Sequence, residues 1–378
     1  MTTRQPEFAP SPRLLLGPGP SAVPERVLRA MASPPLGHLD PQYLELMDRL
    51  RPLLRELFQS ENELTLVMPG TGTSGMEACL LNLLDVGDKA VIGVNGYFGQ
   101  RMVDIGWRSG AEVIAVERPW GETLDEDAIL EAIEDHRPKL VAFVHAETST
   151  GIRQPVEKIA RAARDRGVLV VVDCVTSLGG CPVEIDRWGV DAAYSASQKC
   201  LGAPSGLAPI TLSERAMEAI FSRKTPVRSF YLDLSLLARY WGRERVYHHT
   251  ASSPLLAALY EALRIVFEEG LEARFERHQR QHEALVAGLG EIGLSLTTPT
   301  ESRLPMLNPV RVPAGIDEAD VRRELLTEHG IEIGAGLGEL KGKAWRIGLM
   351  GASATDNNVM LVLGALKKSL ARRSLRTA

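Results

Sequence analysis

Between residues 64 and 173 the chain alternates short apolar runs with segments of helical periodicity. The apolar runs cover residues 64–68, 89–94, 112–117, 139–145 and 168–172, and the helical segments lie near 97–109, 125–135 and 154–166. Strands that alternate with helices in this way predict a mostly parallel sheet with helices on both faces. We therefore expect an α/β fold.

The pattern changes beyond residue 205. A short strand-like run at 206–212 precedes a helix, an irregular segment rich in Arg and Tyr then runs to residue 250, and long helical periodicity follows from about 254 to 289. The remaining residues predict two strands and two helices, at 307–312, 345–350, 317–326 and 358–368. We expect three parts: an extended, proline-rich arm that packs on the rest, a large domain and a smaller α+β domain, at residues 1–20, 21–270 and 271–378.

Composition narrows the class of protein. With 378 residues, of which 44% are hydrophobic, the chain can bury a large core. Its formal net charge of -5 argues against a general nucleic-acid or acidic-membrane binder, so small-molecule partners are expected. Neither a secretory leader nor a membrane span is apparent, and we expect a cytoplasmic protein. Four scattered cysteines without C-x-x-C spacing indicate reduced thiols: Cys79, Cys174, Cys181 and Cys200.

Lys199 stands in the sequence S-A-S-Q-K-C-L-G-A-P, between a strand-like run and a loop rich in Gly and Pro. Its neighbours Ser197, Gln198 and Cys200 give the amine little steric cover, which suits an amine that forms an imine with an aldehyde. For Lys199 alone, a solvated surface lysine would be the simpler interpretation. The surrounding motifs change that balance.

Asp173 ends the apolar run 168–172, and α/β folds bind their ligands at the carboxyl ends of such buried strands. Pyridoxal phosphate needs both a lysine for its aldehyde and a carboxylate that keeps its pyridine nitrogen protonated. The glycine turn at 69–75, P-G-T-G-T-S-G, joins a strand to a helix, where amides and hydroxyls can cradle a phosphate. Together these features predict a pyridoxal phosphate site.

A resemblance to a known family rests on seven motifs in order. They are G-T-G-T-S-G-M-E-A, N-G-Y-F-G-Q-R, H-A-E-T-S-T-G, V-V-D-C-V-T-S-L-G-G, S-A-S-Q-K-C-L-G-A-P, Y-H-H-T and W-R-I-G-L-M-G. The chain resembles the class V aminotransferases of pyridoxal phosphate fold type I, and most of all their alanine/serine-glyoxylate group. The resemblance implies a homodimer with active sites at the subunit interface.

The resemblance also implies roles for individual residues. Lys199 would hold the cofactor aldehyde and then act as the base that moves the substrate proton, while Asp173 would pair with the pyridine nitrogen. Thr148 matches a position near the phenolic oxygen of the cofactor. The positions that would hold the phosphate lie in the glycine turn or beside the lysine: Thr71, Gly72, Thr73 and Gln198.

Four further positions follow from the same resemblance. Phe98 matches the residue that stacks on the cofactor ring, with Tyr97 as the neighbouring alternative, and Arg346 matches the clamp for the substrate carboxylate. Tyr247 and Thr250 match residues that reach the phosphate in the other subunit. We expect no metal at the intervening His248–His249 pair, because adjacent histidines point in different directions and no cluster of ligands joins them.

The implied reaction is a ping-pong transfer of an amino group from alanine or serine to glyoxylate or a similar small 2-oxo acid. Ureidoglycine–glyoxylate transfer in purine breakdown is the main alternative. A cysteine desulfurase-like lyase is disfavoured, because that chemistry needs a cysteine on a mobile C-terminal loop and residues 331–342 contain none. A binding protein without turnover is the remaining alternative, and the presence of both Lys199 and Asp173 disfavours it.

Overall fold

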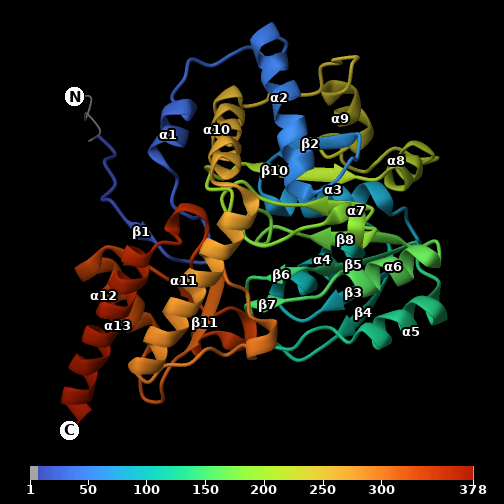
Figure 1. Ribbon diagram of the computed structural model, residues 1–378. Helices are drawn as coiled ribbons and strands as arrows, with labels where there is room; N and C mark the ends of the chain where they lie inside the picture. The colour runs from blue at the N-terminus through green and yellow to red at the C-terminus, as the bar shows by residue number, and fades with distance from the viewer. Residues whose placement is uncertain (1–6, 378) are drawn as a thin grey trace, which may run out of the picture.

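A computed structural model describes residues 7–377. The first six residues of the expected arm, 1–6, lie outside the described residues. Figure 1 shows a large sheet flanked by helices, with a smaller unit and the arm beside the ends of its strands. The described part of the chain contains no helix that is both long and apolar enough to cross a bilayer.

The large sheet has seven strands and is mostly parallel, as expected. In spatial order they are β2 (Leu64–Pro69), β10 (Leu207–Leu212), β9 (Ala192–Tyr194), β8 (Leu169–Asp173), β5 (Leu140–Val144), β3 (Lys89–Val94) and β4 (Glu112–Glu117). β10 runs antiparallel to both of its neighbours, and the other pairings are parallel. β5 and β8 are buried along their whole length, which explains their continuous apolar sequences.

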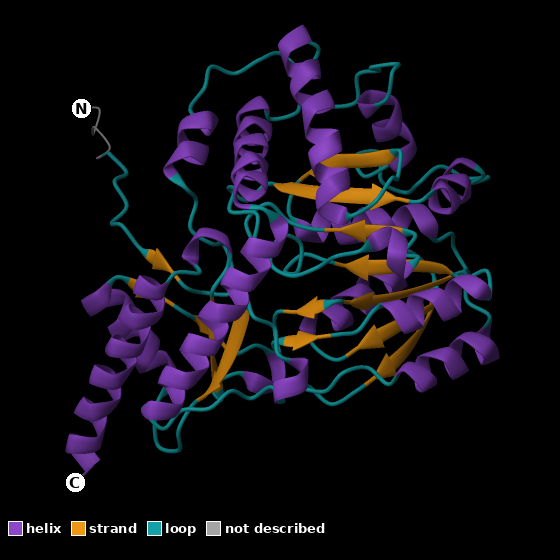
Figure 2. Cartoon of the chain, in the orientation of Figure 1, coloured by secondary structure: helices purple, strands orange, loops and turns teal. Residues whose placement is uncertain are grey.

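Helices cover both faces of this sheet (Figure 2). α3 (Gly72–Leu83) and α4 (Tyr97–Arg108) pack side by side on one face, and α5 (Glu126–His136), α6 (Glu157–Asp165) and the short α7 (Ile185–Trp188) line the other. The ends of the helices follow local chemistry. Asp125, for example, caps α5 by accepting hydrogen bonds from two backbone amides. α8 (Glu214–Phe221) follows β10 and packs against α3.

Three helical features differ from the expectations. α2 (Pro41–Phe58) falls in a stretch to which no element was assigned, although Asp40 caps it and proline stands at its first position. α9 (Leu234–Trp241) lies inside the segment expected to be irregular. The helical periodicity at 254–289 is two helices, α10 (Ser253–Glu269) and α11 (Leu271–Glu291), because Gly270 between them has a φ of +84°.

The smaller unit contains a three-stranded antiparallel sheet in the order β11 (Leu307–Arg311), β14 (Ala344–Gly348) and β13 (Gly334–Ala335). α11, α12 (Glu318–His329) and α13 (Asp356–Thr377) accompany it. Its apolar core, which includes Trp345, is separate from the core of the large sheet. This separation agrees with two domains, while the boundaries at residues 20 and 270 stay predictions.

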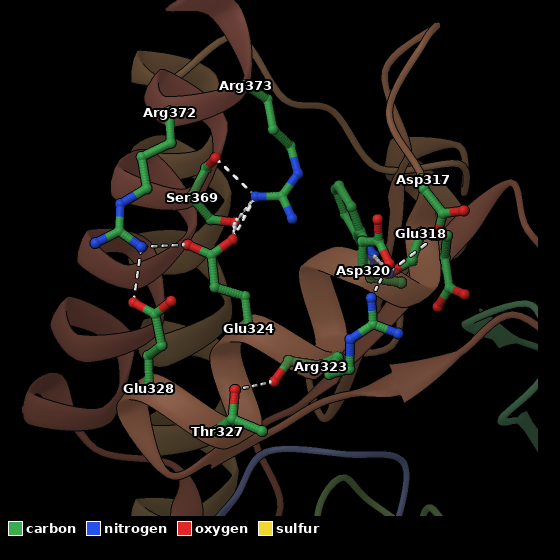
Figure 3. A network of polar contacts seen from close by, with 11 residues as sticks. Asp317, Glu318, Asp320, Arg323, Glu324, Thr327, Glu328, Ser369, Arg372 and Arg373 are labelled. Carbon is green, nitrogen blue, oxygen red and sulfur yellow. Dashed lines mark hydrogen bonds and ion pairs between the residues drawn. The ribbon is translucent and has the colours of Figure 1, made fainter. Parts of the chain in front are cut away.

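Charged side chains join α12 to α13 at the surface (Figure 3). Glu324 on α12 accepts hydrogen bonds from Ser369 (2.9 Å), Arg372 (3.1 Å) and Arg373 on α13. Arg372 also reaches Glu328, one turn further along α12, at 2.7 Å. These contacts tie the two helices together.

The arm runs between the two units. β1 (Leu14–Leu15) pairs in parallel with β12 (Ile331–Glu332), and Leu16 is buried in the core of the smaller unit. After the arm, α1 (Glu25–Met31) packs against α10. A two-stranded hairpin of β6 (Ala146–Glu147) and β7 (Ile152–Arg153) follows β5. Short 3-10 turns at 300–302, 338–340 and 351–353 complete the described elements.

Candidate active site

Asp173 lies at the carboxyl edge of the large sheet, where β8 ends beside β9. Its side chain is 2% exposed and accepts hydrogen bonds from the Val175 amide (2.7 Å) and the Tyr194 hydroxyl (2.9 Å). The parallel register pairs Asp173 with Tyr194, which places both side chains on the same face of the sheet. Burial raises the pKa of Asp173 to about 7, against the opposing effect of these two hydrogen bonds.

Lys199 stands on the turn that follows β9, as its small neighbours predict. The turn is held by Ser197, whose amide bonds to Leu207 O (3.0 Å) and whose hydroxyl bonds to Pro204 O (2.6 Å). The Lys199 amine is half-buried and donates a hydrogen bond to the carbonyl of Pro18. Burial, and secondly the charge of Arg346, lower the pKa of Lys199 to about 8.

The arm covers this lysine directly. Gly19 has a φ of +109°, and a Cβ there would lie 2.7 Å from Lys199 Cδ and 2.8 Å from Nζ. Ser21 fixes the arm on the lysine turn through its amide to Gln198 O (2.9 Å) and its hydroxyl to Lys199 O (2.7 Å). Only glycine fits at position 19, for both steric and conformational reasons.

Arg346 comes from β14 in the smaller unit and is 7% exposed. It donates hydrogen bonds from Nε to Ala335 O (2.6 Å) and from Nη1 to Thr148 O (3.2 Å). Among the described residues no carboxylate forms an ion pair with it, and burial lowers its pKa to about 10, with Glu147 acting in the opposite direction. A buried guanidinium with an unused Nη2 can bind the carboxylate of a ligand.

The glycine turn begins α3 with its donors exposed toward the site. Thr71 is the N-cap in an extended conformation and makes no side-chain capping bond, so its hydroxyl and the first amides of α3 are available. A Cβ at Gly72 would lie 2.8 Å from Val175 Cγ2, so the helix starts directly against the loop after Asp173. Beside Lys199, Gln198 has a buried amide oxygen for which the described part of the chain provides no hydrogen-bond partner.

Two predicted residues lie on the hairpin and on α4. Thr148 is 3% exposed, and its carbonyl receives the bond from Arg346. Phe98 lies in the first turn of α4, half-buried, with the edge of its ring against Tyr97 at a centroid distance of 5.7 Å. The Arg101 guanidinium lies 4.9 Å from the centre of the Phe98 ring and bonds to the Thr73 hydroxyl at 3.0 Å. The Phe98 ring and the glycine turn are therefore connected.

Tyr247 and Thr250 lie apart from this group within the described chain. Tyr247 is 52% exposed, its hydroxyl is 3.3 Å from the Thr250 hydroxyl, and its ring lies 4.5 Å from that of His38. No hydrogen bond or ring contact among the described residues joins either of them to the site around Lys199. Their expected role toward a partner's cofactor stays a prediction.

Sequence reasoning left four contributors unassigned: Pro18, Arg101, Glu147 and Tyr194. Three of them belong to quoted motifs or stand directly before one, but nothing local indicates what they touch. Glu147, a charged residue among small and apolar ones, carried the clearest signal, because such a carboxylate is usually bound by several donors when it is buried. Pro18 contacts a residue 181 positions away, which no local pattern indicates.

The residues present fit pyridoxal phosphate. Helix amides, threonine hydroxyls and an amide side chain suit a phosphate, and a buried carboxylate with a raised pKa suits a protonated ring nitrogen. Within residues 7–377 no cluster of three or more His, Cys, Asp or Glu side chains could hold a metal ion. The four cysteines are buried, and burial raises the pKa of each thiol, so none is placed as a nucleophile.

The chain is similar to known proteins over nearly its whole length. Residues 13–344 match the family model described as Aminotransferase class-V. The (S)-ureidoglycine–glyoxylate transaminase of Bacillus subtilis is 41% identical, over 96% of this chain and 91% of the relative, and the alanine–glyoxylate aminotransferase of Drosophila melanogaster is 40% identical, over 98% and 95%. The crystal structure of the alanine–glyoxylate aminotransferase from Nostoc sp. superposes with a TM-score of 0.95 at 51% identity, over 97% of both chains. The chain therefore belongs to the class V aminotransferases, which are pyridoxal phosphate-dependent transaminases of fold type I.

Proposed function

We propose that this transaminase moves the amino group of alanine or serine to glyoxylate, by a ping-pong mechanism. The observation that carries the proposal is the arrangement of Lys199 and Arg346: a half-buried amine of lowered pKa beside a buried guanidinium that has no carboxylate partner among the described residues. Such a pair suits a small substrate that carries one carboxylate next to the reacting carbon. Glyoxylate is the acceptor named for the relatives above.

Pyridoxal phosphate, when bound, supplies an aldehyde that takes up amino groups and a ring that accepts an electron pair. In our proposal Lys199 holds this aldehyde until an amino acid displaces it. Asp173 would pair with the ring nitrogen and keep it protonated, and the Tyr194 hydroxyl and the Val175 amide fix the carboxylate for this role. Thr71, Gly72 and Thr73 bind the phosphate together with Gln198.

Lys199, once displaced, would remove the proton from the substrate's α-carbon and deliver it to the carbon that was the cofactor's aldehyde, on the other side of the amino nitrogen. An ordinary lysine is almost fully protonated at neutral pH, whereas a pKa of about 8 leaves a useful fraction as free amine. The Pro18 carbonyl accepts a hydrogen bond from the same nitrogen and holds it in place when it is not reacting. Burial therefore keeps part of this base in its free-amine form at working pH, and the Pro18 carbonyl positions it.

Arg346 binds the substrate carboxylate and so sets which bond at the α-carbon points away from the ring plane. Its bonds to Ala335 and Thr148 hold the guanidinium in one orientation. Phe98 would stack on the ring of the bound cofactor, and Thr148 would contact its phenolic oxygen. The first product, a 2-oxo acid, leaves before glyoxylate enters and takes up the amino group, which gives ping-pong kinetics.

The proposal includes a homodimer whose subunits complete each other's sites. Tyr247 is exposed, and Phe230 and Tyr231, exposed by 69% and 47%, lie near it in the ring cluster around His248 and His249. Exposed aromatic residues in one cluster are typical of interfaces. Mixing a Lys199→Ala subunit with a Tyr247→Phe, Thr250→Ala subunit tests this. Activity of the mixture above that of either variant alone is expected, and no recovery would contradict shared sites.

A cytoplasmic location also belongs to the proposal. Four unpaired, buried thiols suit a reducing compartment. Fractionation of the cells that express the protein tests this, with activity expected in the soluble cytoplasmic fraction.

Ureidoglycine is the second candidate donor, because the Bacillus subtilis relative named for it is as similar as the alanine–glyoxylate enzyme of Drosophila melanogaster. One experiment separates the two. The purified holoenzyme is titrated with alanine, serine, glycine and ureidoglycine, and the visible band of the bound cofactor is followed. The true donor removes the band fastest, and glyoxylate then restores it. Preference for ureidoglycine would replace alanine and serine, and a band unaffected by every donor would contradict the proposed function.

A further inference from the structure

Glu147 is a buried carboxylate with no role in the function described so far. It is 0% exposed and lies on β6, between the strand-end position His145 and the proposed cofactor contact Thr148. Both carboxylate oxygens are used. Oε1 accepts from the Ser149 amide (3.0 Å) and hydroxyl (2.6 Å), and Oε2 accepts from the amides of Phe98 (3.0 Å) and Gly99 (3.3 Å).

Two of these donors belong to the first turn of α4. The N-cap of that helix is Gly96, which has no side chain to satisfy the free amides. The hairpin supplies the cap instead. Glu147 takes the amides of Phe98 and Gly99, and the Ser149 hydroxyl accepts from the Tyr97 amide at 3.0 Å while it donates to Glu147. A negative charge at a helix N-terminus adds favourable electrostatics to these bonds.

The start of the helix packs directly against this cap. A Cβ at Gly96 would lie 2.5 Å from the carboxyl carbon of Glu147 and 2.6 Å from Ser149 Oγ, so the backbone of position 96 lies directly on the two side chains. The ring of Phe98 leaves the chain at the residue whose amide Glu147 binds. Because Glu147 holds the Phe98 amide, it also holds the backbone position from which the Phe98 ring extends. This arrangement requires a buried carboxylate.

We propose that Glu147 is a positioning residue that holds the first turn of α4, and with it the Phe98 ring, in the place where the ring covers the bound cofactor. Ser149 assists it by bridging Glu147 and the Tyr97 amide. Because Thr148 lies between the two, the same three residues also carry the carbonyl that orients Arg346. The inference rests on the proposed stacking role of Phe98 and adds the structure that makes this role possible.

The test measures cofactor binding to the cofactor-free protein rather than turnover. In Glu147→Gln the amide nitrogen cannot accept a hydrogen bond, so at least one pair of donors loses its acceptor. We expect pyridoxal phosphate to bind at least about tenfold more weakly and the circular dichroism of its visible band to fall, because a loosely held ring is less ordered. Affinity and circular dichroism within about twofold of the wild-type values would overturn the proposal.

Asp191 provides a matched control at the opposite end of the large sheet. It is also 0% exposed and accepts from a backbone amide, Val170 (3.0 Å), and a serine hydroxyl, Ser213 (2.7 Å). Asp191→Asn is expected to lower thermal stability without changing cofactor affinity or circular dichroism. Equal losses of affinity in both variants would show a general effect of stability and contradict a positioning role for Glu147.

Two further variants keep the inference testable. If Glu147→Gln does not fold, Ser149→Ala is expected to weaken cofactor binding in the same direction by a smaller factor, and wild-type affinity there would refute the proposal. In a Phe98→Ala background, Glu147→Gln should weaken binding little further, because both act through the same ring. If the double variant lost affinity by the product of the two single factors, the two residues would act independently and the proposal would be contradicted. Failure of the wild-type protein itself to take up the cofactor would instead refute the proposed function.

Discussion

Charged groups at the active site and those between α12 and α13 are arranged in opposite ways. Glu324 and Glu328 meet Arg372 and Arg373 in ion pairs near the surface (Figure 3). At the active site, no ion pair among the described residues joins Lys199, Asp173 or Arg346, and burial moves the pKa of each toward its uncharged form. Paired surface charges hold two helices together, whereas unpaired buried charges are kept for a ligand.

The two arrangements of charge have different effects on the free energy of folding. Surface ion pairs contribute little, typically up to about 1 kcal/mol, but they cost little desolvation. Buried unpaired charges destabilise the fold, and hydrogen bonds from backbone groups such as the Val175 amide only partly offset this. A ligand that brings a phosphate, a protonated nitrogen and a carboxylate supplies the missing partners. We therefore expect cofactor and substrate to stabilise this protein strongly.

Lys199→Ala is the substitution with the largest expected effect on the contrast between paired and unpaired charges. We expect transamination to fall by at least about 1,000-fold, because both the group that holds the cofactor and the base are lost. Turnover of alanine and glyoxylate measures it. Lys139→Ala is the matched control, since the Lys139 amine is paired with Asp88 at 2.6 Å and with Asp85 at 3.6 Å. If Lys139→Ala were as inactive as Lys199→Ala, the distinction between the unpaired active-site lysine and the paired surface lysine would be refuted.

Arg346→Lys tests whether the unpaired guanidinium binds the substrate carboxylate. An ammonium cannot make two parallel bonds to a carboxylate, so the KM for the amino donor should rise by about 10- to 100-fold with a smaller change in kcat. Steady-state kinetics at several donor concentrations separate the two constants. Arg311→Lys, at an exposed position on the neighbouring strand β11, should leave both unchanged. An unaltered KM in Arg346→Lys would contradict the proposal that Arg346 binds the substrate carboxylate.

Asp173→Asn is expected to stabilise the cofactor-free protein while it impairs the enzyme. The folded-state pKa of about 7 lies above the ordinary 3.8, so the contribution of Asp173 to stability is present below that ordinary pKa and is lost as pH rises through about 7. Without the carboxylate, the free energy of unfolding at about pH 7.5 should increase by about 1–2 kcal/mol, and less at about pH 5. Denaturant unfolding measures it.

The paired carboxylate Asp191 gives the contrast to that result. Its bonds to Ser213 and to the Arg215 guanidinium, 3.3 Å away, would be weakened in Asp191→Asn, and stability should fall. Stabilisation by both substitutions, or by neither, would contradict the view that Asp173 is buried at a cost and Asp191 is not.

The smallest effect is expected from Glu324→Gln. Because the network between α12 and α13 lies near the surface, the free energy of unfolding should drop by less than about 1 kcal/mol, and added salt should reduce the difference further. Transaminase activity should not change. A loss of several kcal/mol would show that these pairs carry more of the fold than their exposure suggests.

Much of this site follows from local sequence. Asp173 could be placed because a continuous apolar run ends there, and Lys199 because small residues surround it. The caps of α2 and the glycine between α10 and α11 were also visible, as Asp40, Pro41 and Gly270, but a periodic pattern alone did not decide how many helices it formed. Such residues mark the ends of elements better than apolar spacing does.

Contacts between distant segments could not be predicted in the same way. The Pro18 carbonyl on Lys199 and the Glu147 cap on α4 each join parts of the chain that are far apart in sequence. Their geometry depends on how the strands are ordered in the sheet, and no spacing of residues encodes that. The contacts of Tyr247 and Thr250 are still harder to predict from sequence, because they are expected in another subunit. They stay a prediction.

The pairing of β1 with β12 has a consequence for how the enzyme is made. Leu14 leaves the ribosome early, whereas Ile331, its partner in the strand pair, is translated more than three hundred residues later. The large sheet is complete once β10 has emerged, so Lys199 can take its place in a folded core, and Ser21 can bind its turn, before β1 has a strand to pair with. The strand pair that joins the arm to the smaller unit therefore forms last, after the lysine turn is already in place.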